Sequence, residues 1–244
     1  MRINRLSCIA FVCSACFFAL IARAEVLIYN IVPGQSSLTI SGTFAGQPFT
    51  PQTAGSTTTS YSGTILADVG VATISFPGGS SINAANQAFS QQPGNEGNPG
   101  TALANYGILA NLAPFGTGIA AIRGLVLDIT SGTINLGGTS IPSQQTLAVS
   151  SGNIDYSSAV AFGRQDMSGN SASNAGTAGS LISSVGTSTL TIPVNFTITQ
   201  STITTNDTIL TVTGTLLATR PVPEPGSLAG LTLFALASIR RQRH

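Results

Sequence analysis

The chain has 244 residues, of which only 7% are charged, and its 27 glycines outnumber all its charged residues together. Between residues 25 and 222, three arginines stand against seven carboxylates, which leaves a net charge of −4, and lysine and tryptophan are absent. This part therefore lacks the basic stripe that a nucleic-acid partner requires. The only histidine is His244, so the body has no Ser-His-Asp or Cys-His nucleophile, no imidazole metal site and no lysine Schiff base.

Residues 1–24 predict a secretory signal peptide. Two arginines near the start precede an apolar stretch over residues 6–21, and Ala22 and Ala24 place small residues at the two positions that signal peptidase reads. The pattern implies passage through the Sec translocon and cleavage after Ala24. The alternative is an N-terminal anchor that is never cut.

All three cysteines, Cys8, Cys13 and Cys16, lie in this predicted signal peptide. None follows the small-residue pattern that marks a lipoprotein signal. After cleavage the protein would have no thiol, which excludes disulfides and thiolate metal sites from residues 25–220.

The first half of this body reads as a series of strands. β-branched residues, alternation of period two and turn residues such as Pro33 and Gly34 mark them. Strands are expected at residues 26–32, 37–44, 60–69 and 71–76, with a loop over residues 47–56.

Residues 80–100 are polar and rich in Asn, Gln, Gly and Pro, and predict either a long surface loop or a boundary between two subdomains. A helix is the competing prediction at residues 101–112, where Leu103, Tyr106, Leu109 and Leu112 recur at intervals of three.

The second half returns to strands, and its last part has the clearest pattern. Apolar residues alternate with polar ones over residues 190–198 and again over 210–218, which predicts two neighbouring antiparallel strands with one buried face each. Pro193 falls on the outward face and predicts a sheet edge. Further strands are expected at residues 122–130, 132–136, 146–149, 152–156 and 160–162, with a loop over 165–179.

A tripeptide centred on glycine recurs along the chain. The central residues are Gly42, Gly63, Gly132, Gly152 and Gly214, and the spacings of 90 and 89 residues between the first and third and the second and fourth leave open a degenerate duplication or chance repetition. Either way, the sequence predicts an all-β fold. An antiparallel sandwich-like domain is favoured over a β-helix, because no period of about 20 to 25 residues persists.

Residues 221–244 predict a sorting tail with a short transmembrane helix. The 13 residues from 227 to 239 would reach about 20 Å as a helix, against a hydrocarbon core of about 30 Å. Arg240, Arg241 and Arg243 follow and would hold that end in the cytoplasm. A core or amphipathic helix is the alternative, but the apolar residues surround the whole helix and leave no polar face.

The run Val222, Pro223, Glu224 and Pro225, followed by the apolar segment and the arginine cluster, resembles the PEP-CTERM sorting domain. The resemblance covers about a tenth of the chain. It implies recognition by an exosortase, a membrane-embedded cysteine enzyme of Gram-negative bacteria that make extracellular polysaccharide. It also implies cleavage near the motif, with loss of residues 228–244 after a transient stay in the inner membrane.

The residue types leave few reactions open for the body. A glycosidase with two carboxylates is the one remaining hydrolase plan, but each acidic residue has an ordinary structural explanation. Calcium ligands are conceivable in two groups, neither of which matches a known loop: Asp166, Asn170 and Asn174, and Asn95, Glu96 and Asn98. We therefore expect no enzyme activity, no metal and no cofactor.

The sequence thus predicts an exported protein of the cell surface or extracellular matrix with a structural or adhesive body. The alternative is a module that binds the cell's own polysaccharide, with Tyr61, Tyr106 and Tyr156 as stacking surfaces.

Overall fold

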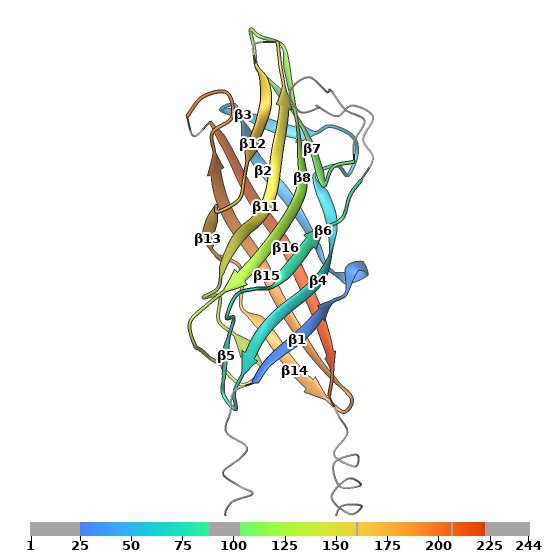
Figure 1. Ribbon diagram of the computed structural model, residues 1–244, viewed down its shortest axis with the longest axis vertical. Helices are drawn as coiled ribbons and strands as arrows, with labels where there is room; N and C mark the ends of the chain where they lie inside the picture. The colour runs from blue at the N-terminus through green and yellow to red at the C-terminus, as the bar shows by residue number, and fades with distance from the viewer. Residues whose placement is uncertain (1–24, 88–102, 160, 206, 223–244) are drawn as a thin grey trace, which may run out of the picture.

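The computed structural model describes residues 25–87, 103–159, 161–205 and 207–222. These residues form an antiparallel all-β structure, which confirms the predicted fold class (Figure 1). No helix among them is long and apolar enough to cross a membrane. The elements are β1 (Glu25–Ile31), η1 (Pro33–Gln35), β2 (Ser37–Phe44), β3 (Gln47–Pro51), β4 (Thr58–Val69), β5 (Thr73–Ser75), β6 (Ser81–Ala84), β7 (Tyr106–Asn111), β8 (Thr117–Thr130), β9 (Ile134–Asn135), β10 (Ser140–Ile141), β11 (Thr146–Ser157), β12 (Phe162–Asp166), β13 (Ser171–Ser173), β14 (Gly179–Ser184), β15 (Thr187–Gln200) and β16 (Thr208–Pro221).

All the strands belong to one hydrogen-bonded sheet, whose long strands run obliquely along the molecule (Figure 1). The predicted hairpin of β15 and β16 is its longest pairing and extends over both strands without a break. On the side away from β15, the first part of β16 pairs with β2 and its last part pairs with β1. Both β1 and β2 also pair with β4, so they lie one after the other between β16 and β4. β6 pairs with both β4 and β8, and thereby joins strands that precede and follow residues 88–102.

Asn174, which follows β13, connects two distant parts of the sheet. Its side-chain amide donates to the carbonyl of Pro193 at 2.9 Å and accepts from the backbone N–H of Asn195 at 2.9 Å. β13 itself pairs with β11, so these bonds place β15 beside the β11–β13 part of the sheet, although the two are far apart in the strand order. The sheet therefore curves until these two parts meet.

Pro193 lies beyond the end of β14, which pairs only with residues 187–191 of β15. The expectation that its strand lies at a sheet edge is wrong, because β15 lies between β14 and β16. Only the part of β15 beyond residue 191 lacks β14 as a neighbour, and Asn174 bonds to it there.

The core is one cluster to which both halves of the chain contribute. Leu190, Ile192, Val194, Phe196 and Ile198 of β15 are all buried, as period-two alternation predicts. Leu210, Val212, Leu216 and Ala218 of β16 are buried on the same principle.

The predicted helix over residues 101–112 is wrong, because β7 occupies part of it. Tyr106, Ile108 and Ala110 point into the core and pair within a strand beside β8, so the relevant period is two. The leucines at intervals of three do not share one buried face, so their spacing does not reflect a helix. Leu112 is buried after the strand, whereas Leu103 is exposed before it.

Several short strands lie where loops were expected. β3 falls in residues 47–56, β6 in 80–100 and β13 in 165–179, and β10 and β14 were also missed. Strands of two to six residues show too few alternations to stand out from polar loops. Conversely, the two strands expected at 146–149 and 152–156 are one strand, β11, whose pairing with β8 shifts register at Ser151.

The recurring glycines have a conformational explanation. Gly42, Gly63, Gly152 and Gly214 lie within strands at φ values of 135°, 108°, 148° and 148°, a region that other residues rarely adopt. In β2 and β16, Gly42 lies opposite Leu210 and Gly214 opposite Leu38, so each glycine faces a buried leucine of its partner strand.

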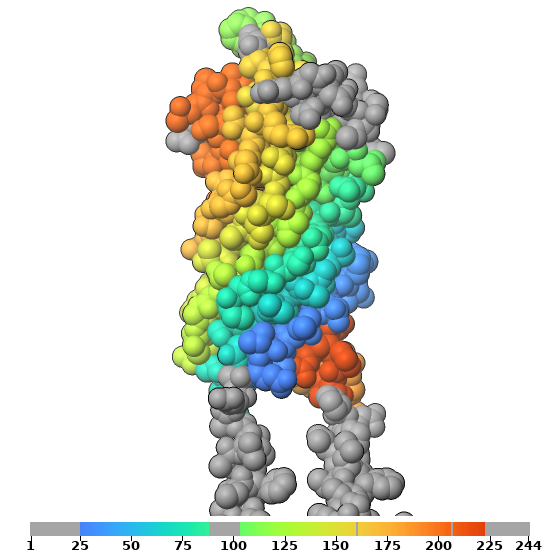
Figure 2. Space-filling model, viewed as in Figure 1, coloured from blue at the N-terminus to red at the C-terminus, as the bar shows by residue number. Residues whose placement is uncertain are grey.

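The ends of the described chain lie together at one end of the molecule, which we call the terminal end. β1 begins there and β16 finishes there, and the two strands pair at Asn30 and Thr219 (Figures 1 and 2). The turns after β4 and after β14 lie at the same end. The opposite end, formed by the β2–β3 turn and the loops after β7 and β15, we call the distal end.

Candidate functional site

The predicted sorting and processing residues fall outside the described residues, with one exception. Ala22, Ala24, Pro223, Glu224, Pro225, Arg240, Arg241 and Arg243 are all outside them. Val222 is the last described residue, and its backbone N–H donates to the carbonyl of Gly186 in the β14–β15 turn at 3.1 Å. The start of the predicted sorting motif is therefore fixed to the terminal end.

A pocket of about 240 Å³ opens at the distal end. Three segments that are far apart in the sequence form it: the β2–β3 turn, the β7–β8 loop and the β15–β16 loop. Its walls are mostly apolar, with polar groups from Gln47, Thr204 and Asp207. We call it the distal pocket, and it is lined by Ala45, Gln47, Leu112, Ala113, Phe115, Ile203, Thr204 and Asp207.

Asp207 fixes the loop that forms one wall of this pocket. Its carboxylate accepts hydrogen bonds from the backbone N–H groups of Thr202, Ile203 and Thr204 at 2.6 to 2.9 Å, and from the Thr202 hydroxyl at 2.8 Å. Partial burial opposes ionisation, but these donors outweigh it and lower the pKa of Asp207 below 3.8. The carboxylate is therefore ionised at neutral pH and committed to the loop, which makes it a poor proton acceptor for catalysis.

Two aromatic rings are exposed at the distal end. Phe115 in the pocket wall is 55% exposed, and Phe162 at the start of β12 is 66% exposed. Sequence reasoning missed both as candidate binding residues. The available signal was a phenylalanine between Pro114 and Gly116, since a large apolar side chain in a turn has no core to enter.

The three tyrosines expected as stacking surfaces do not have that role. Tyr61 and Tyr106 are fully buried, with their hydroxyls 2.8 Å apart, and Tyr106 also donates to the carbonyl of Leu38. Burial raises the pKa of both hydroxyls. Tyr156 is buried as well and donates to the carbonyl of Thr202 at 2.9 Å. The prediction failed because polar flanking residues do not reveal which face of a strand points inward.

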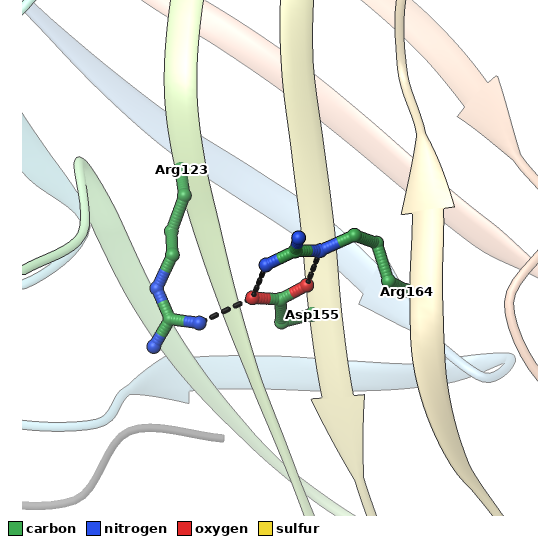
Figure 3. Close-up of polar contacts among 3 residues, drawn as sticks. All are labelled: Arg123, Asp155 and Arg164. Carbon is green, nitrogen blue, oxygen red and sulfur yellow. Dashed lines mark hydrogen bonds and ion pairs between the residues drawn. The ribbon is translucent and has the colours of Figure 1, made fainter. Parts of the chain in front are cut away.

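Asp155 brings two arginines together across three strands. The carboxylate, on β11, is fully buried and accepts a bidentate pair of bonds from Arg164 of β12, at 2.6 Å from Nε and 2.8 Å from the terminal nitrogen (Figure 3). Arg123 of β8 donates to the same carboxylate from the other side (Figure 3). The hydrogen bonds that Arg164 donates to Asp155 raise the pKa of its guanidinium. This cluster ties β8, β11 and β12 together.

The residues considered for calcium are occupied in other ways. Asp166 accepts from the backbone and hydroxyl of Ser168, Asn170 bonds Met167 and Gln200, and Asn174 connects β11 to β15. Within the described part of the chain, no three His, Cys, Asp or Glu residues are grouped as metal ligands. The other set, Asn95, Glu96 and Asn98, lies outside the described residues.

Fold and site together define an antiparallel all-β protein with both described ends at one pole and an apolar pocket at the other. Comparisons with protein-family models, with curated proteins and with solved structures found no match.

Proposed function

We propose that this chain is the precursor of an exported protein of the cell surface or extracellular matrix of a Gram-negative bacterium. A signal peptide over residues 1–24 directs it through the Sec translocon, and an exosortase sorts it at Val222, Pro223, Glu224 and Pro225 and cleaves it near that motif. The β body is a non-enzymatic structural or adhesive unit. It is one antiparallel sheet that lies in the sequence between the two predicted export signals.

The observation that carries the proposal is the position of the two described ends. The start of β1 and the finish of β16 lie side by side at the terminal end (Figure 2). A chain that is held by either flanking segment is therefore held at that one pole. The distal end, with its pocket and exposed rings, then points away from the point of attachment. This is the orientation that a surface protein needs if its outer end is to meet partners.

The hydrogen bonding of the carboxylates supports a body without catalysis. Asp155 is committed to two arginines, and Asp207 to its own loop. Asp128 accepts from the backbone N–H groups of Gly79, Ser80 and Ile129. A glycosidase needs two carboxyl groups free to face a substrate, and these three are engaged in holding backbone segments.

Processing of the tail tests the proposal. Cells with and without the exosortase are fractionated, and the C-terminal peptide of the released protein is identified by mass spectrometry. We expect a released form that lacks residues 228–244 and depends on the exosortase. A peptide that runs intact through Arg240, or identical fractionation in both strains, would refute the sorting claim. Glu224→Gln should retain precursor in the membrane, whereas Asp166→Asn, an equally conservative change on the exposed surface of the body, should not.

The distal pocket favours a second candidate, a module that binds the cell's own polysaccharide. Sugar rings stack on aromatic faces, and Phe115 offers a half-exposed ring beside the hydrogen-bonding groups of Gln47 and Thr204. Binding of the full chain to the purified polysaccharide and to a broad glycan array tests it. Phe115→Ala should abolish binding and Val71→Ala, at the opposite end, should not. No binding by the unaltered protein would remove this candidate.

A further inference from the structure

Aliphatic side chains project from the tips of two hairpins at the terminal end. Val71, in the β4–β5 turn, is fully exposed, and Val185, in the β14–β15 turn, is 83% exposed. Three further exposed aliphatic residues lie on the strands beside these turns: Val26 and Ile28 of β1 and Ile182 of β14. The two turns lie on either side of the described chain ends (Figure 1).

This distribution of exposed aliphatic residues indicates a contact surface. Hairpin tips are ordinarily filled by Gly, Asn, Asp and Ser, because a turn faces water. Single exposed apolar residues are normal, but a group of them at one pole marks a contact surface. Charge at this end is mixed, since Glu25 and Asp68 accompany Arg220, so the surface fits an apolar partner better than a strongly charged one.

The length of the chain beyond the structure identifies the partner. Val222 is fixed to the β14–β15 turn, and only five residues, 223–227, separate it from Leu228, where the apolar run begins. Even fully extended, five residues span at most about 18 Å. A tail that enters a bilayer therefore holds Val222, and the adjoining turn with Val185, close to the lipid. The β4–β5 turn with Val71 lies at the same end of the molecule (Figure 1).

We propose that the terminal end docks on the lipid bilayer, with the side chains of Val71 and Val185 inserted between the headgroups. The proposal rests on the proposed function in that the tail brings the body to the membrane. The docking contacts themselves belong to the body. Two tips on either side of the tail would hold the long axis of the molecule upright and would present the sorting motif at a fixed height above the membrane.

Fluorescence quenching by lipid tests this placement. Residues 25–244, the form that remains after the proposed signal cleavage, contain no cysteine. This form carries one new cysteine through Val71→Cys, Val185→Cys, Phe115→Cys or Ala235→Cys, labelled with an environment-sensitive dye. Each is reconstituted in vesicles of phosphatidylethanolamine and phosphatidylglycerol whose acyl chains are brominated close to the headgroup. We expect a blue shift and loss of fluorescence at Val71 and Val185, and neither at Phe115.

Two outcomes overturn the proposal. If the label at Ala235 is quenched and those at both tips are not, the tail inserts without docking of the body. If no label is quenched, docking fails and the membrane step of the proposed function fails with it.

A longer linker separates docking from mere proximity. Roughly twenty Gly and Ser residues inserted after Val222 lengthen the tether by about 25 Å on average, which frees the body to leave the surface. Quenching at both tips should persist if they bind lipid. Loss of quenching at the tips in this variant would show that the tail alone kept them near the membrane, which would refute docking.

Discussion

The glycine within β2 gives the sharpest test of the fold. Gly42 has a φ of 135°, and a Cβ atom added there would lie 2.0 Å from the backbone carbonyl oxygen of Ile209 in β16. Because the obstacle is backbone within a continuous strand pairing, it cannot rotate away. Gly42→Ala should therefore force β2 and β16 apart.

The magnitude follows from two contributions. A non-glycine residue in this region of φ costs about 1 to 3 kcal/mol, and displacement of the strand raises the total to about 3 kcal/mol or more. For a protein of this size each 1 kcal/mol lowers the Tm by about 2 to 4 °C, so Gly42→Ala should lower it by about 6 to 12 °C.

The chain supplies a matched control. Gly132 stands in the same Ser-Gly-Thr triplet, has no positive φ, and a Cβ there would meet nothing within 4 Å. Gly132→Ala should leave the Tm unchanged or raise it slightly, because alanine restricts the unfolded chain. Thermal unfolding followed by circular dichroism measures both variants. Equal Tm values for Gly42→Ala and the unaltered protein, or equal losses in the two variants, would refute the explanation of the recurring tripeptide.

Three further predictions follow from the hydrogen bonds. Asn174→Ala should lower the free energy of unfolding by about 1 to 3 kcal/mol in a urea titration, since it leaves the backbone groups of Pro193 and Asn195 without their partner; an unchanged midpoint would contradict its role in joining β11 to β15. The lowered pKa of Asp207 stabilises the folded state above pH 3.8, and this contribution is lost as the pH falls through the pKa of the folded state. In Asp207→Asn the free energy of unfolding should therefore decrease less steeply in acid than in the unaltered protein. The same pH dependence in both proteins would contradict this role of Asp207. Burial raises the pKa of Tyr61 and Tyr106, so the stability of the folded state is retained below pH 10 and decreases at higher pH. In a spectrophotometric titration both tyrosines should ionise only when the protein unfolds. Ionisation of the two in the folded protein near pH 10 would contradict their burial.

The long strands could be predicted from the sequence and the short ones could not. β2 was expected over residues 37–44 and lies there, and the β15–β16 hairpin follows the predicted alternation. In these strands enough residues alternate for burial on one face to show in the pattern. β10 and β13 have two or three residues each, so their strand conformation depends on the neighbour that pairs with them.

The distal pocket could not be predicted because it depends on pairing between distant segments. The turn that holds Ala45, the loop that holds Phe115 and the loop that holds Asp207 meet only once β2, β7 and β16 are in register. Sequence patterns indicate which residues are buried, but they carry little information about which strands are neighbours. The predicted signal peptide and sorting tail are different, because each prediction depends on one contiguous stretch of sequence.

The pairing of β16 has a consequence for the order in which an exported chain folds. β16 is the only strand partner of β15 beyond residue 191, pairs with seven of the eight residues of β2 and also pairs with β1. The first strands therefore cannot complete their pairing before the last strand is present. Contacts between the two ends of a chain form late, because closing so long a loop is entropically unfavourable. On the proposed export route, a chain that crosses the membrane N-terminus first would complete this sheet only after residue 221 has emerged, when the predicted sorting tail still has to follow. Completion of the sheet and arrival of the proposed sorting signal would then coincide, and a protein released earlier would be an open sheet exposed to proteases.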